Sequence, residues 1–488
     1  MRRHPPAPPS RRGSAPGAGT CWGASGSNRW SAACAGGQAG ARPGPTGTCL
    51  RFTPRRGIAA SPAHRRGSAT PPISRWKPGS RPRPPILRRA MARGEGGVHI
   101  GVDASSWENE RGFGRFTRNL IAALAARDSG FRYSLLFDQP PTRPVPGGVD
   151  VVVAGSGRSM SEASSGAAAR GGADLLTMMR SARGMDCDLF FYPAVYSYFP
   201  LPARRPSVVC YHDTIPERFP DLIFPRRLNF RLWQAKCWLA KMQATRVMTI
   251  SEASATDLTR ILRIPRSRID TITEGGDAAF HPIGDTERLA AVRARHAIPE
   301  GAPLLVYLGG FNRHKNVLRL IEAMPAILDH VPGLRLAIVG RTAGARFWDN
   351  VEELQASAAA DARRSGSIVF TGEIDDAELA ELLNTADALV FPSLWEGFGL
   401  PALEAMSCGT PVLSSDRGSL PEVVGDGGLY FDPLSVEDLA AQAVRLLTEP
   451  GLQADLAGKA LARSAQFGWD KGAALAEESF RSALGRTL

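Results

Sequence analysis

The sequence predicts an α/β protein built from two doubly wound halves in tandem. From Val98 onward, short apolar runs alternate with helical stretches. Several of these runs are apolar almost throughout, as expected for parallel strands that helices cover on both faces. After a polar connector the same pattern starts again, and a chain of 488 residues is too long for one ordinary core.

The first half is expected over residues 96–285 and the second over residues 286–465. Strands in the first half are predicted at 98–105, 133–138, 149–155, 188–193, 207–213 and 246–251, with 268–282 closing that half. In the second half they are predicted at 303–310, 334–340, 367–372, 387–393, 410–416 and 428–433. Ligands of such folds bind where strands end, so a cleft between the halves is expected. The tail, 466–488, contains an amphipathic helix at 469–484 that is expected to pack back toward the first half.

The positive charge of the chain is confined to its first part. The formal net charge is +12, yet residues 1–90 hold 17 of the 59 Lys and Arg residues and no acid, which leaves 42 basic and 47 acidic residues elsewhere. Nucleic-acid binding is therefore excluded as the main function. We expect 1–95 to be a disordered basic leader. It is either a transit peptide or, as we favour, an upstream extension of a protein whose translation starts at Met91.

The seven cysteines show no pairing typical of metal sites. Cys187, Cys210, Cys237 and Cys408 lie singly in apolar settings, which predicts buried free thiols in a reducing, cytoplasmic compartment. No apolar run is long enough to span a membrane.

The stretch "EGFGLPALE", from Glu396 to Glu404, lies where a predicted strand turns into a helix. Gly397 and Gly399 allow the backbone to approach a ligand closely, and Pro401 suits the first helical position. The free N–H groups of such a helix start attract phosphate. The two glutamates can accept hydrogen bonds from sugar hydroxyls. The alternative is an ordinary helix start between two surface acids, which fits this specific spacing less well.

Three further stretches follow predicted strands. "LGGFNRHKN" (308–316) supplies Lys315, a cation at the carboxyl end of a strand, where positive charge can stabilise an oxyanion without a metal, although a solvated basic loop is the plainer alternative. "ERGFGRFTRNL" (110–120) is a glycine turn that opens a helix, with Gly112 and Gly114 as candidates to face phosphate. Arg115 and Arg118 follow there, although helix arginines are usually surface residues. "VVCYHDTIPERFP" (208–220) places His212 and Asp213 at a strand end, where a lone histidine is more often structural.

Two other features have plain explanations. Asp186-Cys187-Asp188 spells D-x-D, a pair of acids that can hold a metal ion, but it only precedes a strand. The basic stretch 225–242 is expected to be a helix packed on its sheet; the alternative is a helix that docks on an anionic membrane.

The segment "PSLWEGFGLPALEAMSCGTPV" (392–412) resembles the E-x7-E signature of the group 1 (family 4) retaining glycosyltransferases, which have the GT-B fold. The resemblance extends over 368–390 and 419–433 and covers essentially 98–484. It implies that Glu404 binds the ribose of the donor nucleotide, that Glu396 contacts the transferred sugar, and that the backbone from Phe398 to Leu400 lies at the sugar and phosphates.

The resemblance also implies roles for other residues of the predicted site. His212 would contact the transferred sugar, and Lys315 matches a lysine that neutralises the diphosphate. The family usually has arginine before that lysine, where this chain has His314, with Arg313 one residue earlier. Either could supply the second cation.

The function implied is that of a retaining, metal-independent glycosyltransferase with no cofactor. It would move a hexose from a GDP- or UDP-sugar to a glycan or lipid-linked acceptor. "GGFNRHKN" and "HDTIPERFP" resemble bacterial mannosyltransferases, which favours mannose. In such enzymes the leaving phosphate takes the proton of the acceptor, with Asp213 as a second candidate base. The alternatives are a sugar-nucleotide epimerase of the same architecture and a non-catalytic nucleotide-sugar-binding subunit.

Overall fold

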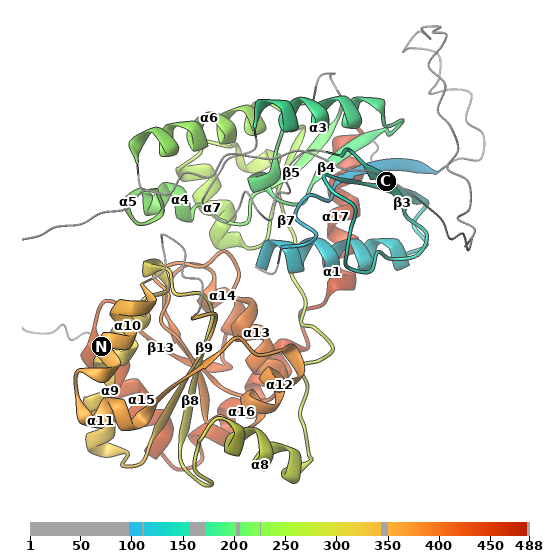
Figure 1. The fold of residues 1–488 in the computed structure, drawn as a ribbon. Coiled ribbons are helices and arrows are strands. Elements are labelled where there is room, and N and C mark those ends of the chain that lie inside the picture. The colour runs from blue at the N-terminus through green and yellow to red at the C-terminus, as the bar shows by residue number, and fades with distance from the viewer. Residues whose placement is uncertain are drawn as a thin grey trace, which may run out of the picture. The chain divides into compact units, whose positions relative to one another are not determined.

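The computed structural model describes residues 97–109, 112–155, 171–201, 205–224, 226–342 and 350–485. The predicted leader therefore lies outside the described residues. The described chain forms two sheets, one of seven strands in the order β3-β2-β1-β4-β5-β6-β7 and one of six in the order β10-β9-β8-β11-β12-β13 (Figure 1). The strands of the first sheet are β1 (Val98–Asp103), β2 (Phe131–Phe137), β3 (Asp150–Val153), β4 (Leu189–Tyr192), β5 (Ser207–Cys210), β6 (Arg246–Thr249) and β7 (Ile269–Thr271). Those of the second are β8 (Leu304–Leu308), β9 (Arg335–Val339), β10 (Ile368–Gly372), β11 (Ala388–Phe391), β12 (Val412–Ser415) and β13 (Gly428–Phe431).

Every predicted apolar run forms a strand, and each strand pairs with its neighbours in parallel. The central strands β4, β5, β11 and β12 are buried at every position. Burial of successive residues means burial of both faces, which explains why these runs are apolar without alternation. The predicted fold class, two doubly wound α/β halves, is confirmed.

Helices connect the strands. In the first half they are α1 (Gly112–Ala126), α3 (Gly172–Gly184), α4 (Ile215–Arg218), α5 (Pro220–Ile223), α6 (Arg227–Gln243) and α7 (Glu252–Arg260). In the second half they are α8 (Thr286–Arg295), α9 (Val317–His330), α10 (Val351–Ala359), α11 (Ala362–Ser367), α12 (Asp376–Asn384), α13 (Leu400–Ser407), α14 (Leu420–Val424), α15 (Val436–Thr448) and α16 (Leu452–Ser464). The last helix is α17 (Trp469–Ala483).

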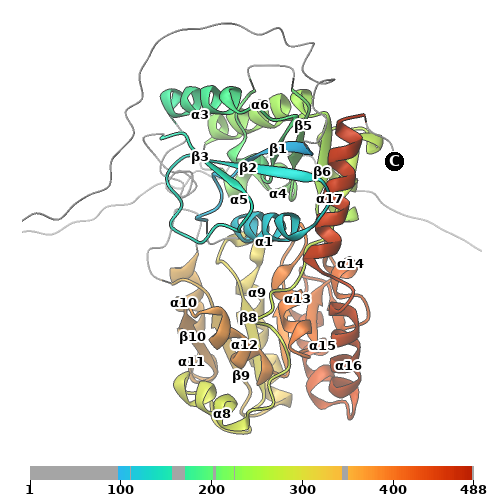
Figure 2. The same cartoon turned by 90° about the vertical axis from the view of Figure 1, so that its right-hand side faces the viewer.

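The last helix packs on the first sheet, far from its neighbours in sequence. It runs beside α1 (Figures 1 and 2). The ring of Phe480 is fully buried. It packs in T-shaped contacts with Phe131 and Phe191, with ring centres 6.1 Å and 5.1 Å apart. Helices α3 and α6 lie on the opposite face of that sheet (Figure 1), where buried side chains such as Met178 and Cys237 join a separate cluster. Burial of apolar surface by α17 therefore helps to complete the core of the first half.

In both sheets the strand order reverses next to the first strand. Strand β1 lies between β2 and β4, and β8 lies between β9 and β11. In doubly wound sheets ligands bind at such switch points, beyond the carboxyl ends of the strands. The loops that follow β1, β5, β8 and β11 carry the residues singled out in the sequence.

The Asp186–Asp188 pair lies before β4, at the amino-terminal ends of the strands and not at the carboxyl ends where ligands bind. Oδ2 of Asp188 accepts a hydrogen bond from the backbone N–H of His99 at 2.9 Å. Within the described ranges, no group of three or more His, Cys, Asp or Glu side chains is placed to hold a metal ion. The described cysteines are free thiols; Cys187 is partly exposed, contrary to the expectation that all are buried. Helices long and apolar enough to cross a membrane do not occur in the described part of the chain.

Candidate active site

The loop between β11 and α13 holds the backbone of the E-x7-E segment in a fixed shape. Gly399 precedes the helix with φ +112°, a conformation that glycine adopts without strain. A Cβ atom at Gly397 would lie 2.4 Å from the carbonyl oxygen of His212, so only glycine fits there. Oγ of Ser419 donates a hydrogen bond to the carbonyl oxygen of Phe398 at 2.7 Å and lies 3.1 Å from that of Glu396. This loop therefore brings the backbone of the second half against the end of β5.

Glu396 is paired with Lys315. Nζ of Lys315 lies 2.7 Å from Oε1 of Glu396, and both side chains are largely buried. Lys315 ends a 3-10 turn, η3 (Arg313–Lys315), in the loop that follows β8. The next residue, Asn316, has φ +59°, and its side chain donates to the carbonyl oxygens of Pro392 at 3.0 Å and Pro433 at 2.7 Å. The structure thus brings these two predicted site residues into contact.

Glu404 lies one turn inside α13 and meets a cation from the first half. Nη1 of Arg115 lies 2.8 Å from Oε1 of Glu404, and Nη2 lies 2.6 Å from Oδ2 of Asp376 on α12. Burial raises the pKa of Glu404 to about 7, although the charge of Arg115 acts to lower it. Only 3% of the Glu404 side chain is exposed. Arg115 is thus the principal partner of the predicted ribose-binding acid.

A second buried carboxyl, Glu274, lies near this pair. It follows β7 and is 3% exposed. Burial and then the nearby charge of Glu404 raise its pKa to about 8, while Arg115 acts in the opposite direction. No hydrogen bond joins its carboxyl group to another described residue. At neutral pH this group therefore holds a proton in most molecules.

His212 and Asp213 follow β5 and face the glycine loop of the second half. Nε2 of His212 lies 2.8 Å from the carbonyl oxygen of Pro193. The imidazole ring packs in a T-shaped contact with Phe116, with ring centres 4.6 Å apart. Burial lowers the pKa of His212 to about 4, so the imidazole is neutral. Burial raises the pKa of Asp213 to about 7, and its Oδ1 accepts from the N–H of Ile215 at 2.8 Å. Asp213 is therefore the better proton acceptor of the two at neutral pH.

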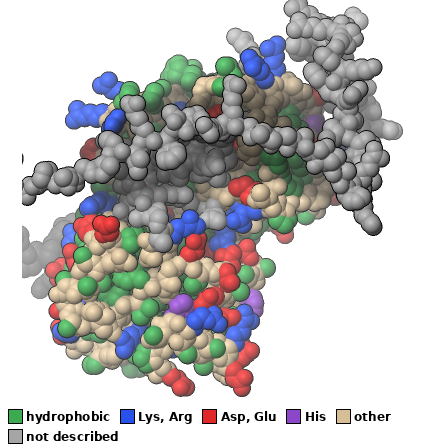
Figure 3. All heavy atoms as spheres, viewed as in Figure 1, with side chains coloured by type: hydrophobic (Ala, Val, Ile, Leu, Met, Phe, Trp, Pro, Cys, Tyr) green, Lys and Arg blue, Asp and Glu red, His purple; other side chains and the backbone are tan. Residues whose placement is uncertain are grey.

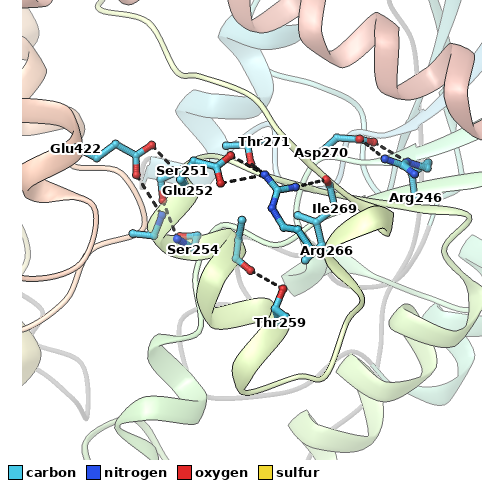
Figure 4. A network of polar contacts seen from close by, with 12 residues as sticks. Arg246, Ser251, Glu252, Ser254, Thr259, Arg266, Ile269, Asp270, Thr271 and Glu422 are labelled. Carbon is cyan, nitrogen blue, oxygen red and sulfur yellow. Dashed lines mark hydrogen bonds and ion pairs between the residues drawn. The ribbon is translucent and has the colours of Figure 1, made fainter.

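Helix α7 joins the halves at this point. Oγ of Ser254 lies 3.0 Å from the carbonyl oxygen of His212 and 3.2 Å from that of Gly397. Glu422 of α14 accepts hydrogen bonds from the first N–H groups of α7, at Glu252 (2.9 Å) and Ala253 (3.1 Å) (Figure 4). A carboxylate at a helix start is favourable because those N–H groups have no partner in the helix. The hydroxyl of Ser254 thus lies between a backbone carbonyl of the E-x7-E loop and one at the end of β5.

The glycine loop after β1 has one constrained position. A Cβ at Gly114 would lie 2.0 Å from the carbonyl oxygen of Asn109, whereas one at Gly112 would meet nothing within 4 Å. Arg118 donates to the carbonyl oxygens of Trp107 and, at 2.9 Å, of Asn109. The role of Gly114 in the fold is therefore tight packing, and Arg118 is a loop-bracing residue.

The two candidates for the second cation differ sharply. Nη2 of Arg313 lies 2.8 Å from Oε2 of Glu353 on α10, and its side chain is more than half exposed. His314 is buried, and burial followed by the charge of Lys315 lowers its pKa to about 4. Arg313 is thus directed to another partner, and His314 is neutral and supplies no charge; Arg313 stays a predicted donor contact.

Sequence reasoning ranked Arg115 below the two glycines, because arginines on helices are usually surface residues, and it did not select Glu274 or Asp376. Arg115 follows Gly114 directly, at the helix start where a ligand-facing residue is expected. Glu274 could also have been selected, because it lies three residues after the end of β7, at the carboxyl end of a parallel strand.

Two family models match the chain. Residues 290–463 match the model "Glycosyl transferases group 1", and residues 111–280 match "Glycosyltransferase Family 4".

Curated relatives are mannosyltransferases and other glycosyltransferases. The chain is 30% identical over 285 residues to O-antigen chain mannosyltransferase B of Escherichia coli, a match that spans 58% of this chain and 71% of that protein. It is 32% identical to the serotype-specific mannosyltransferase WbdA of Escherichia coli over 57% of this chain, which is 33% of that longer protein. It is 34% identical to D-inositol 3-phosphate glycosyltransferase of Streptomyces bingchenggensis over 42% of this chain and 48% of that one.

Solved structures share the fold at low sequence identity. Sucrose-phosphate synthase from Thermosynechococcus elongatus matches 80% of this chain and 100% of its own with a TM-score of 0.62 at 20% identity. HepE of Anabaena, solved with UDP-glucose, matches 79% and 100% with a TM-score of 0.60 at 19% identity. The two sheets with parallel strands have the arrangement of the GT-B fold, and the chain belongs to the group 1 glycosyltransferases.

Proposed function

We propose that this protein is a retaining glycosyltransferase that moves a hexose, with mannose favoured, from a nucleotide diphosphate sugar to a glycan or lipid-linked saccharide. The observation that carries the proposal is the arrangement of Glu396 in the loop before α13 and Glu404 one turn inside that helix, with Lys315 2.7 Å from Glu396. Mannosyltransferase relatives at 30–32% identity support the choice of sugar.

The donor would lie along this loop. Glu404 would accept hydrogen bonds from the ribose, and the N–H groups at the start of α13, with Phe398 to Leu400, would face the sugar and phosphates. Lys315 would exchange Glu396 for a phosphate oxygen, and Glu396 would then accept from sugar hydroxyls. His212, neutral and held by Pro193, would contact the transferred sugar. Gly112, Gly114 and Arg313 remain predicted donor contacts.

The reaction would proceed on one face of the sugar. The bond from the anomeric carbon to the phosphate oxygen breaks, the acceptor oxygen bonds to that carbon from the same side, and the acceptor proton passes to the leaving phosphate. Lys315 and the helix start would stabilise the charge on that phosphate, which removes the need for a metal. The protein would otherwise act by holding donor and acceptor in position.

The test uses the full chain. A thermal-shift screen with GDP-mannose, GDP, UDP-glucose and UDP should show stabilisation by one nucleotide series, because a ligand of the native state raises the melting temperature. The responsive donor is then incubated with oligosaccharide and lipid-linked acceptors in EDTA, and the product linkage is assigned by NMR.

An α-linked product from an α-linked donor, formed in EDTA, supports the proposal. An inverted linkage overturns retention, and a strict requirement for a divalent metal overturns the charge assignment to Lys315. Conversion of the donor sugar without any acceptor would identify an epimerase instead. Donor binding with neither transfer nor hydrolysis would identify a binding subunit.

Peripheral contact with the inner face of the cytoplasmic membrane is a second part of the proposal, supported by α6. Exposed apolar residues recur on one face of this helix at spacings of four and three: Leu228, Leu232, Ala235, Leu239 and Met242. The helix contains four basic residues and no acid. Hydrophobic and basic side chains lie side by side along the edge that α6 occupies (Figure 3). Anionic lipid suits this charge, whereas two copies of the helix would repel each other.

Co-sedimentation of the full chain with vesicles tests this contact. Binding is expected to vesicles rich in phosphatidylglycerol and to decline with salt. The double variant Leu232→Gln, Leu239→Gln should lose it, while Leu461→Gln, at an exposed leucine of α16, should not. Equal binding by both variants would refute the assignment to α6.

A further inference from the structure

One guanidinium group gathers three acids that come from separate elements. Arg115 of α1 lies 2.8 Å from Glu404 of α13, 2.6 Å from Asp376 of α12 and 3.9 Å from Asp277, which follows β7. Its two terminal nitrogens contact different partners, Nη1 on Glu404 and Nη2 on Asp376. A planar fork held at two points has a fixed orientation, so it also fixes the carboxylate that it contacts.

The pair between Arg115 and Glu404 is shielded from water. The Arg115 side chain is 21% exposed and that of Glu404 is 3% exposed. The guanidinium also lies 5.6 Å from the ring centre of Phe280. Arg115 contacts Oε1 of Glu404, so Oε2 remains for a ligand. Ion pairs of this kind differ from exposed pairs, whose loss changes little.

We propose that Arg115 is a positioning residue for donor binding, which keeps the carboxylate of Glu404 ionised and turned so that Oε2 accepts hydrogen bonds from the ribose. The proposal rests on the donor site proposed above. The ribose site then needs a residue from the first half. The other residues assigned to the nucleotide lie in the second half, apart from Gly112 and Gly114, which are assigned to the phosphates.

The charges around Glu404 explain why a cation is required. The titratable groups that face it are Arg115, Asp376, Asp277, Glu274 and the neutral thiol of Cys408. Without Arg115, buried Glu404 would have three acids and no cation nearby. Both burial and repulsion then favour the protonated carboxyl group, which is a poorer acceptor for two ribose hydroxyls.

Calorimetry with UDP and GDP between pH 6 and 9 tests the proposal on the full chain. The affinity of the wild type for its cognate nucleotide should be high above pH 7 and lower below pH 7. Arg115→Ala should bind it at least tenfold more weakly at pH 7, and the deficit should shrink toward pH 9, where Glu404 ionises without help. Arg115→Lys should recover most of the affinity at pH 7. Arg445→Ala, at an exposed i,i+4 pair on α15, should match the wild type.

Three results would overturn the proposal: binding by Arg115→Ala within twofold of the wild type at every pH, a loss of equal size at every pH, or tighter binding. The last would show that Arg115 competes with the ribose. If Arg115→Ala does not fold, Arg115→Gln replaces it in the same series. Glu404→Ala separates the two proposals: undiminished nucleotide binding by that variant refutes the donor site itself, whereas a loss there with none in Arg115→Ala refutes only the role of Arg115.

Discussion

Nζ of Lys315 lies 2.7 Å from Oε1 of Glu396, and this contact joins the turn after β8 to the loop after β11. The two loops lie on neighbouring strands at the switch point of the second sheet. The positive charge of Lys315 compensates the negative charge of Glu396, which would otherwise repel a diphosphate ligand. A donor that binds there must exchange partners with both residues.

Lys315→Ala is expected to lower kcat by about 100-fold or more, since loss of one group that stabilises developing charge typically costs 10²–10³ in rate. Steady-state kinetics with the cognate donor measures this, and circular dichroism verifies the fold. Lys459→Ala, at an exposed pair with Asp455 on α16, is the matched control. A Lys315→Ala enzyme with wild-type kcat would rule out the proposed charge stabilisation.

Gly114→Ala should destabilise the protein, while Gly112→Ala in the same turn should not. The added methyl group at Gly114 would lie 2.0 Å from a backbone oxygen, and the one at Gly112 would lie in open space. We expect a loss of about 1–3 kcal/mol in the free energy of unfolding for Gly114→Ala. Urea denaturation of both variants measures the difference, and equal stabilities would contradict the packing described here.

Donor kcat/KM should rise with pH and level off above about pH 7 to 8. Burial raises the pKa of both Glu404 and Asp213 to about 7, so below that pH each group increasingly holds a proton and loses its capacity as an acceptor. The pKa of His212 is about 4, so His212 is neutral throughout this range. The rise should therefore persist in His212→Gln. Its disappearance in that variant would assign the titration to the histidine.

Glu274→Gln should stabilise the protein at alkaline pH. The pKa of Glu274 is about 8 in the fold, against an ordinary value of 4.5, so ionisation favours the unfolded chain increasingly between these values. Its removal should add about 1–3 kcal/mol to the free energy of unfolding at pH 9 and almost nothing at pH 4.5.

Urea denaturation at both pH values measures the effect of Glu274→Gln. Glu449→Gln on the surface of α15 serves as the control and should change little at either pH. A gain of the same size at pH 4.5 and pH 9 would show that the ionisation of Glu274 is not its source.

The strands could be predicted because burial on both faces leaves a direct trace in composition. Runs such as β4 and β11 are apolar at every position, and no surface helix has that pattern. The E-x7-E segment was readable for a similar reason: Gly397 and Gly399 are fixed by a backbone approach and a positive φ, which few other residues tolerate.

The partners of Glu404 could not be predicted, because they depend on contacts between distant parts of the chain. Arg115 and Glu404 are 289 positions apart. Local pattern describes Arg115 only as a basic residue in the first turn of a helix. Likewise, nothing near Arg313 in sequence indicates that Glu353, on another helix, attracts its side chain.

The position of α17 has a consequence for how the protein is made. Phe480 closes over Phe131 and Phe191, and Oγ of Ser479 donates to Asp270 at 2.7 Å. The first half is therefore synthesised with part of its apolar core still exposed to solvent, and some two hundred further residues must be added before α17 can cover that surface. During translation this surface is a natural site for chaperones, and a nascent chain halted before α17 should be far more sensitive to proteases than its finished form.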